Sequence, residues 1–410
     1  MRKLTGIRNA RVRGRRGPVD VRIAADGRIE RIGRGLRLPR GVRSFDADGG
    51  LLLPSFIDPH VHLDLAYTCD EVPANRSGTL LEAIAHWSRH KARLKPKEVE
   101  ARACRAIEAE IEFGTGFIRT HVDVAVASGL RLCEGVLAAR ERYRDRIDIQ
   151  VVTFPQDGLI RDPGAFEQMR EAMRMGCDLI GGIAHNERTA DDSRRHVGLL
   201  FDLAEEFDAP IDCHIDETDD PQSMCTEHLA ATAIERRRQG RVTASHACAL
   251  ASYDDAHARR VIDLIAEARV RVVTNPCVNL HLQGRYDGYP KRRGLTRVKQ
   301  LMAAGVVVAS GQDCIKDPFY PLGTGQMLDV AHMLVHADHL STGPEMNKAL
   351  DTITSDAARV LGLSDYGVKP GAFADLVVLP VADVHEALRL RPRPVLVLKR
   401  GRVVHGAGKN

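Results

Sequence analysis

The chain has 410 residues, of which 44% are hydrophobic and 28% are charged, and its formal net charge is +4. These values are typical of a globular protein, and the charge is too small to indicate a nucleic-acid partner. No apolar run approaches the ~20 residues of a membrane span, so we expect no membrane association. The nine cysteines form no C-x-x-C pair, which favours reduced thiols in a cytoplasmic protein over a disulfide framework.

Both ends of the chain contain short strand-like runs. Near the N-terminus, residues 19–23 and 28–32 flank Asp26-Gly27, a dipeptide that favours a tight hairpin turn. Similar runs close the chain, at residues 374–379, 394–398 and 401–404. Since neither end can bury a core alone, we expect residues 1–54 and 366–410 to pair into one small β-sandwich module.

Between the two ends, short apolar runs alternate with helical patterns. The runs lie at residues 51–62, 117–123, 148–154, 178–184, 209–214, 241–246, 270–275 and 306–312. The helical patterns include residues 80–90, 97–113, 131–143, 196–207 and 253–268. From the second run onward the repeat is about 30 residues, the size of a βαβ unit.

This alternation predicts an α/β fold, a (β/α)8 TIM barrel over residues 55–365. An open doubly wound sheet is the alternative fold. Such a sheet ordinarily carries a glycine-rich phosphate loop after its first strand, where this chain has Asp58-Pro59-His60-Val61-His62. A nucleotide cofactor is therefore disfavoured.

The H-x-H pair at the end of the first run is a candidate for metal binding. On a strand, side chains two residues apart point to the same face, so His60 and His62 can meet one ion. Taken alone, such a pair is also common as hydrogen-bonded histidines near a surface.

Further polar residues stand where later strands are expected to end, the side of a TIM barrel that carries the active site. The fifth run ends at His214, with Glu217 three residues later. The sixth run ends at His246 and the eighth at Asp313. Together with the H-x-H pair, these residues predict a metal site at one rim of the barrel.

This set of histidines and an aspartate resembles the metal-binding pattern of the amidohydrolase superfamily, whose barrels often carry a β module built from both chain ends. The fourth run, residues 178–184, contains no lysine. Because two-metal members bridge their ions with a carboxylated lysine, the resemblance implies a single ion. More of the chain is similar to the bacterial cytosine deaminases, in residues 154–158, 214–220, 243–246, 279–294 and 317–323.

The resemblance implies hydrolytic deamination of a free cytosine-type base. One divalent ion, Zn²⁺ or Fe²⁺, would be held by His60, His62, His214 and Asp313. The ion would make hydroxide available near neutral pH, and hydroxide would attack the amino-bearing carbon and release ammonia. Asp313 would also take the water proton, His246 would hydrogen-bond the hydroxide, and Glu217 would carry a proton to the ring nitrogen.

The same resemblance implies the substrate contacts. Gln156 offers a donor and an acceptor, which match the carbonyl and N–H edge of a pyrimidine, although a polar residue after a strand can also cap a helix. Leu80, Leu282 and Phe319 are expected to be pocket walls, and ordinary core positions are the alternative.

Two positions depart from the cytosine deaminase pattern. Those enzymes usually carry a histidine before the eighth-strand ligand and an aspartate after it, where this chain has Gln312 and Cys314. A thiol in place of a carboxylate removes a charge and leaves room for a methyl group, whose burial contributes about 0.8 kcal/mol. We therefore expect 5-methylcytosine to be accepted at least as well as cytosine, with a neutral replacement at Cys314 as the alternative.

Other functions are weighed against this one. Deamination or hydrolysis of another small nitrogen heterocycle, such as isocytosine, a triazine, a pterin or a creatinine-like ring, is the enzymatic alternative. A barrel with a structural metal is the non-enzymatic one. The zinc deaminase design with H-x-E and P-C-x-x-C fails, because Pro276-Cys277 lacks the second cysteine. The resemblance also implies a homo-oligomer.

Overall fold

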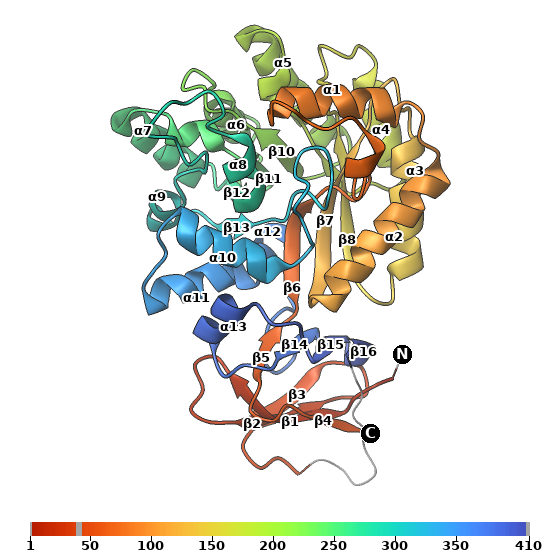
Figure 1. Cartoon of the computed structure of the whole chain (residues 1–410), viewed down its shortest axis with the longest axis vertical. Coiled ribbons are helices and arrows are strands. Elements are labelled where there is room, and N and C mark those ends of the chain that lie inside the picture. The colour runs from red at the N-terminus through yellow and green to blue at the C-terminus, as the bar shows by residue number, and fades with distance from the viewer. Residues whose placement is uncertain (1, 38–42, 407–410) are drawn as a thin grey trace.

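The computed structural model describes residues 2–37 and 43–406. The chain forms a barrel of parallel strands surrounded by helices, and below it a sheet that contains both chain ends (Figure 1). Among the described residues, none of the helices combines the length and the hydropathy that crossing a bilayer requires.

The barrel is an eight-stranded sheet whose spatial order follows the sequence, as expected for a (β/α)8 fold. Its strands are β6 (Phe56–Val61), β7 (Thr115–Asp123), β8 (Asp148–Phe154), β9 (Leu179–Ile180), β10 (Ile211–Ile215), β11 (Val242–His246), β12 (Arg271–Thr274) and β13 (Val308–Ser310). Six of them were predicted to within two residues at each end.

The first and last strands meet and close the barrel. A parallel bridge joins Val61 to Asp313. On either side of it, the Asp313 amide donates to the His60 carbonyl over 2.7 Å and the His62 amide donates to the Asp313 carbonyl over 2.9 Å. This closure confirms the barrel and excludes the open doubly wound sheet.

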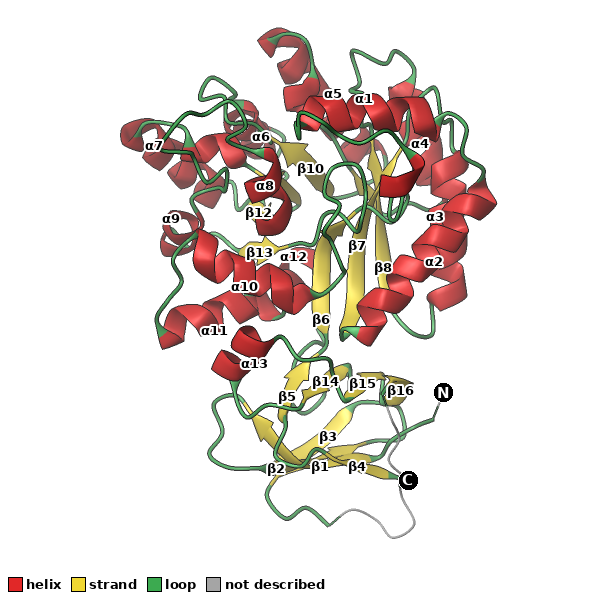
Figure 2. Ribbon diagram, in the orientation of Figure 1, coloured by secondary structure: helices red, strands yellow, loops and turns green. Residues whose placement is uncertain are grey.

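Helices cover the outside of the barrel (Figure 2). They are α1 (Leu80–Lys91), α2 (Pro96–Glu112), α3 (Arg131–Tyr143), α4 (Ala165–Met175), α5 (Ala190–Glu206), α6 (Cys225–Glu235), α7 (Asp255–Glu267), α8 (Pro276–Leu282), α9 (Val298–Ala303), α10 (Met327–Ala337), α11 (Gly343–Asp351) and α12 (Ser355–Leu361). Three short 3-10 segments add to them, at Cys69–Glu71, Ala184–Asn186 and Cys248–Ala251. Their apolar faces join the barrel strands in the main core.

The second sheet combines strands from both chain ends, in the order β16-β15-β14-β5-β1-β2-β3, with β4 paired to β1. These strands are β1 (Gly6–Val12), β2 (Val19–Ile23), β3 (Ile29–Gly33), β4 (Ser44–Asp46), β5 (Leu51–Pro54), β14 (Leu376–Leu379), β15 (Leu396–Lys399) and β16 (Arg402–His405). Helix α13 (Val384–Leu390) lies between β14 and β15 in the chain. Residues of β1, β2, β5, β14 and β15 share one core, so the expected terminal β module is confirmed.

The predicted turn of this module is present at Asp26-Gly27, between β2 and β3. Gly27 has a φ of +89°, and a Cβ there would lie 2.4 Å from the Arg400 carbonyl oxygen. Only glycine fits this approach of the two chain ends.

The structure corrects the prediction of one strand over residues 51–62. Residues Leu51–Pro54 form β5 in the terminal module, and Phe56–Val61 form β6 in the barrel. Both segments are apolar because both are buried, so hydrophobicity alone cannot separate them. The predicted strands at 178–184 and 306–312 are also shorter, as β9 and β13. At Gly181, a Cβ would lie 2.2 Å from the Thr153 carbonyl oxygen, so the chain leaves the strand by a close approach of backbones.

Candidate active site

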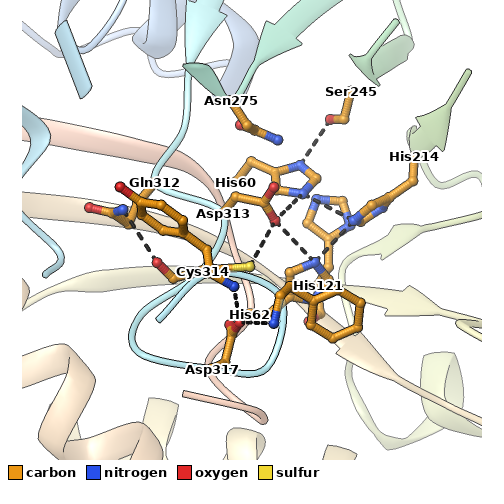
Figure 3. Close-up of polar contacts among 12 residues, drawn as sticks. His60, His62, His121, His214, Ser245, Asn275, Gln312, Asp313, Cys314 and Asp317 are labelled. Atoms are coloured by element: carbon orange, nitrogen blue, oxygen red, sulfur yellow. Dashed lines mark hydrogen bonds and ion pairs between the residues drawn. The ribbon is translucent and has the colours of Figure 1, made fainter. Parts of the chain in front are cut away.

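The predicted metal ligands converge at the end of the barrel where its strands finish (Figure 3). His60 Nε2 lies 3.1 Å and His62 Nε2 lies 3.0 Å from His214 Nε2. Asp313 Oδ1 lies 3.6 Å from His60 Nε2 and 3.5 Å from His62 Nε2. All four side chains are buried. Residues from β6, β10 and the end of β13 thus form one cluster, as their sequence pattern predicted.

The backbone at these strand ends is unusual. His246 and Asp313 have φ values of +73° and +65°, a left-handed conformation that costs energy in residues other than glycine. Next to them, Gly311 allows close packing, because a Cβ there would lie 2.7 Å from His60 Cβ. The strands therefore end in tight turns that aim these side chains into the barrel mouth.

The donor set fits a divalent cation. His62 Nδ1 lies 3.0 Å from the His121 carbonyl oxygen, which can only accept, so Nδ1 carries the ring proton. Burial lowers the pKa of His62 to about 4, which leaves the ring neutral and its Nε2 lone pair aimed at His214 and Asp313. Three imidazole nitrogens and a carboxylate oxygen thus meet in one buried space, a donor set that zinc and ferrous iron accept.

His246 and Glu217 lie beside this cluster. Ligand atoms of His60, His214, His246 and Asp313 all lie within 4.8 Å of one another, so His246 also comes within reach of an ion. His246 Nδ1 lies 3.5 Å from Glu217 Oε1 and 3.9 Å from Asp313 Oδ2.

The acid–base character of these groups follows from their burial. Burial raises the pKa of Glu217 to about 8, so its carboxyl holds a proton at neutral pH. Burial and the Glu217 carboxyl raise the pKa of Asp313 well above its usual range. Burial lowers the pKa of His246 well below its usual range, so its ring is neutral.

A small pocket lies against the cluster. It contains all five predicted substrate-contact residues, namely Leu80, Gln156, Leu282, Cys314 and Phe319. Glu217, His62, His214 and Asp313 also line it, and so do Leu65 and Val278, which sequence reasoning missed. The pocket has a free volume of about 20 Å³, and an outer cavity of about 470 Å³ shares Leu80, Glu217 and Leu282 with it.

Cys314 sits in the turn that follows the Asp313 ligand. Its thiol is buried and lies 3.8 Å from Asp313 Oδ1. Burial, with Asp313 and Asp317 nearby, raises the pKa of Cys314 well above its usual range, so the sulfur stays a neutral thiol. Gln312 braces the same turn, because its side-chain amide donates to the Cys314 carbonyl and accepts from the Gly325 amide.

Helix α1 carries Leu80 and is attached to the loop that carries Gln156. Lys91 Nζ lies 2.7 Å from Asp123 Oδ2 and 2.8 Å from Asp157 Oδ2. Ser88 Oγ donates to Asp157 Oδ1 over 2.7 Å. Lys91 directly follows the predicted helix of residues 80–90, and the sequence gives no sign that its ammonium is buried between two carboxylates.

Two residues around the cluster were also missed. Asn279 donates to His246 Nδ1 over 2.9 Å, from helix α8. Asn279 lies within helix α8, which ends at Leu282. His121 packs against the His60 ring, with ring centroids 4.0 Å apart. His121 lies two residues after Arg119 in the predicted strand 117–123, and two polar side chains on one face of a buried strand could have indicated it.

Comparison with known proteins gives the relatives of this chain. The model of the amidohydrolase family matches residues 43–405. A pterin deaminase of Rhizobium rhizogenes is 31% identical over 389 residues, which cover 93% of this chain and 87% of the relative. An N-isopropylammelide isopropyl amidohydrolase of Pseudomonas sp. is 31% identical over 366 residues, or 88% of this chain and 87% of the relative.

A solved structure matches almost the whole chain. It is a 5-methylcytosine deaminase from Klebsiella pneumoniae, liganded with 5-fluorocytosine, at 38% identity and a TM-score of 0.94. The match covers 99% of this chain and 98% of that one.

Proposed function

The chain belongs to the amidohydrolase family as a metal-dependent hydrolase of C–N bonds, and we propose that it deaminates a free cytosine-type base, with 5-methylcytosine preferred. The products are thymine or uracil and ammonia. One observation carries the proposal: the histidine–aspartate cluster, a protonated Glu217 and a neutral Cys314 all border the same small pocket.

The metal role belongs to His60, His62, His214 and Asp313, which would hold one Zn²⁺ or Fe²⁺ ion. When bound, such an ion lowers the pKa of water and so supplies hydroxide at neutral pH. The short strand β9 and its flanks contain no lysine, and this supports one ion rather than a bridged pair. Metal analysis of the purified protein tests the count.

Three side chains would handle protons. Asp313 presents Oδ1 to the histidines and Oδ2 toward His246, so one carboxylate can both bind and accept the water proton. Glu217 enters the reaction protonated and can give its proton to the ring nitrogen, after which its carboxylate can take a proton that comes from the attacking water and pass it to the leaving amine. His246, held by Asn279, would hydrogen-bond the attacking oxygen.

Ring selection would fall to Gln156 and Cys314. The Gln156 amide can pair with a carbonyl and a ring N–H at the same time. A neutral thiol at Cys314 packs against a 5-methyl group, whereas a carboxylate there would lose solvation against it. The Klebsiella 5-methylcytosine deaminase, at 38% identity over nearly the whole chain, supports this choice of base.

A pterin or an N-alkylated triazine is the second candidate substrate, because relatives with such names are 31% identical to this chain. The Klebsiella 5-methylcytosine deaminase matches this chain at 38% identity, above the 31% of the pterin deaminase, and this favours a single pyrimidine ring over the two fused rings of a pterin. We also propose that the protein acts in the cytoplasm as a homo-oligomer, which sedimentation of the purified protein tests for subunit number.

The test is ammonia release from cytosine, 5-methylcytosine, isocytosine, pterin and N-isopropylammelide side by side. We expect the largest kcat/KM for 5-methylcytosine, with cytosine next. A larger kcat/KM for pterin or N-isopropylammelide would contradict the proposed substrate and leave the hydrolase chemistry in place.

A further inference from the structure

We propose that Ser245 and Asp212 are positioning residues that set the tautomer of His60, so that its Nε2 faces the metal. The inference rests on the proposed metal role of His60. It concerns a chain of contacts that runs from the ligand away from the pocket, to the buried Arg119.

Each hydrogen bond in this chain of contacts can be donated in only one direction. His60 Nδ1 lies 3.0 Å from Ser245 Oγ, and Ser245 Oγ lies 2.8 Å from Asp212 Oδ1 (Figure 3 shows the first contact). A carboxylate can only accept, so the Ser245 hydroxyl donates its proton to Asp212. The Ser245 oxygen is then left to accept from His60 Nδ1–H, and the His60 proton is fixed on the nitrogen that faces away from the cluster.

Arg119 keeps Asp212 in its role as an acceptor. Arg119 Nη1 donates to Asp212 Oδ2 over 2.7 Å, and both side chains are buried. Arg119 is itself anchored by the Gln150 side chain, whose oxygen accepts from its Nε and Nη2. The far end of the chain of contacts is therefore a buried ion pair.

The three histidines of the cluster are held in different ways. His62 donates from Nδ1 to the His121 backbone carbonyl. His214 Nδ1 has no hydrogen-bond partner among the described residues, and its ring stacks on Phe154 with centroids 4.0 Å apart. Of the three, only His60 has its Nδ1 hydrogen-bonded to a side chain, that of Ser245. A single side-chain substitution can therefore remove the hydrogen bond that fixes the tautomer of His60, which is not possible at His62 or His214.

The experiment measures zinc affinity rather than turnover. Metal-free wild-type protein and the Ser245→Ala variant are titrated with Zn²⁺ in competition with a chromophoric chelator. We expect Ser245→Ala to bind Zn²⁺ about 10- to 100-fold more weakly, the usual effect of losing a hydrogen-bond partner of a metal-bound histidine. The visible spectrum of the Co²⁺-substituted variant should change as well, because His60 meets the ion in an altered orientation.

Ser310→Ala is the matched control. Ser310 is buried at the end of β13, and among the described residues its hydroxyl has no hydrogen-bond partner. This variant should keep the wild-type zinc affinity and Co²⁺ spectrum at a similar Tm. Equal zinc affinities of Ser245→Ala and Ser310→Ala would overturn the positioning role alone. Failure of the wild-type chain to bind Zn²⁺ or Fe²⁺ tightly would overturn the metal site, and the proposed function with it.

Discussion

The metal cluster and the pocket wall of the site are built from different parts of the fold. His60 and His214 lie within strands β6 and β10, where neighbouring strands fix the backbone on both sides. Leu80 begins a helix, and Gln156 and Phe319 lie in segments that follow strands. Their positions depend on loop contacts such as that of Ser88 with Asp157. The barrel strands thus hold the proposed metal ligands, whereas loops hold the residues proposed to contact the substrate, so a change in a loop can alter substrate selection without moving the ligands.

The largest effect is expected when a proposed metal ligand on a barrel strand is removed. His214→Ala should lower kcat/KM by about 10⁴-fold or more and abolish tight metal binding, because the cluster loses its central nitrogen. Ammonia release and bound metal are measured together. An active variant without bound metal would contradict the role of the cluster.

Glu217→Gln tests proton transfer without removing a ligand. The amide keeps the shape of the side chain but cannot carry a proton, so kcat should fall by about 10²- to 10⁴-fold. Metal content and Tm should stay near the wild-type values. Unchanged turnover would favour a metal of purely structural role.

Cys314→Asp tests the pocket wall, which is built mainly from residues outside the strands. A carboxylate beside the ring should lower the ratio of kcat/KM for 5-methylcytosine to that for cytosine by about 10-fold, because it must lose solvation against the methyl group. Cys314→Ser, which adds no charge, is the control and should keep the ratio within a few-fold. A ratio unaffected by the aspartate would remove Cys314 from substrate selection.

The stability of the metal-free protein should depend on pH through Glu217. Its pKa is about 8 in the folded chain and 4.5 ordinarily, so between these values the folded chain holds a proton that the unfolded chain has released. Its contribution to stability is present in full below pH 4.5 and falls by about 1 kcal/mol per pH unit up to pH 8. The Tm of the metal-free wild type should fall relative to that of Glu217→Gln as the pH rises across this range, because the glutamine amide stays uncharged at every pH. A constant difference would contradict a protonated Glu217.

Ser88→Ala should give the smallest effect. It removes the hydrogen bond from α1 to Asp157, which contributes about 1 kcal/mol, while Lys91 still holds the same carboxylate. We expect KM to rise by less than about 5-fold with kcat nearly unchanged. A loss confined to kcat would mean that α1 acts on the chemistry rather than on binding.

The same contrast explains what could be predicted from the sequence. The strand-borne residues follow from simple rules, since H-x-H places His60 and His62 on one face and parallel strands bring His214 and Asp313 to the same rim. The wall residues came only from a resemblance, because no periodicity indicates which loop residue faces a pocket. Their gathering in one pocket is a property of the folded chain.

Some features could not be predicted because tertiary contacts create them. The left-handed backbone of His246 and Asp313 opposes their local preference and is held by the surrounding barrel. The chain from Ser245 to Arg119 joins three strands, and each member alone is an ordinary buried polar residue. The division of residues 51–62 between two sheets depends on pairing partners at the far end of the chain, in β14.

The closure of the barrel by β6 and β13 also determines when the histidine–aspartate cluster can form during synthesis of the chain. His60 and His62 leave the ribosome early, whereas Asp313 and the strand that carries it are made only after seven barrel strands. The complete ion site therefore cannot exist on a growing chain until β13 pairs with β6. On the proposed metal role, the ion would bind only after this closure and would then hold the first barrel strand against the last, in addition to supplying hydroxide.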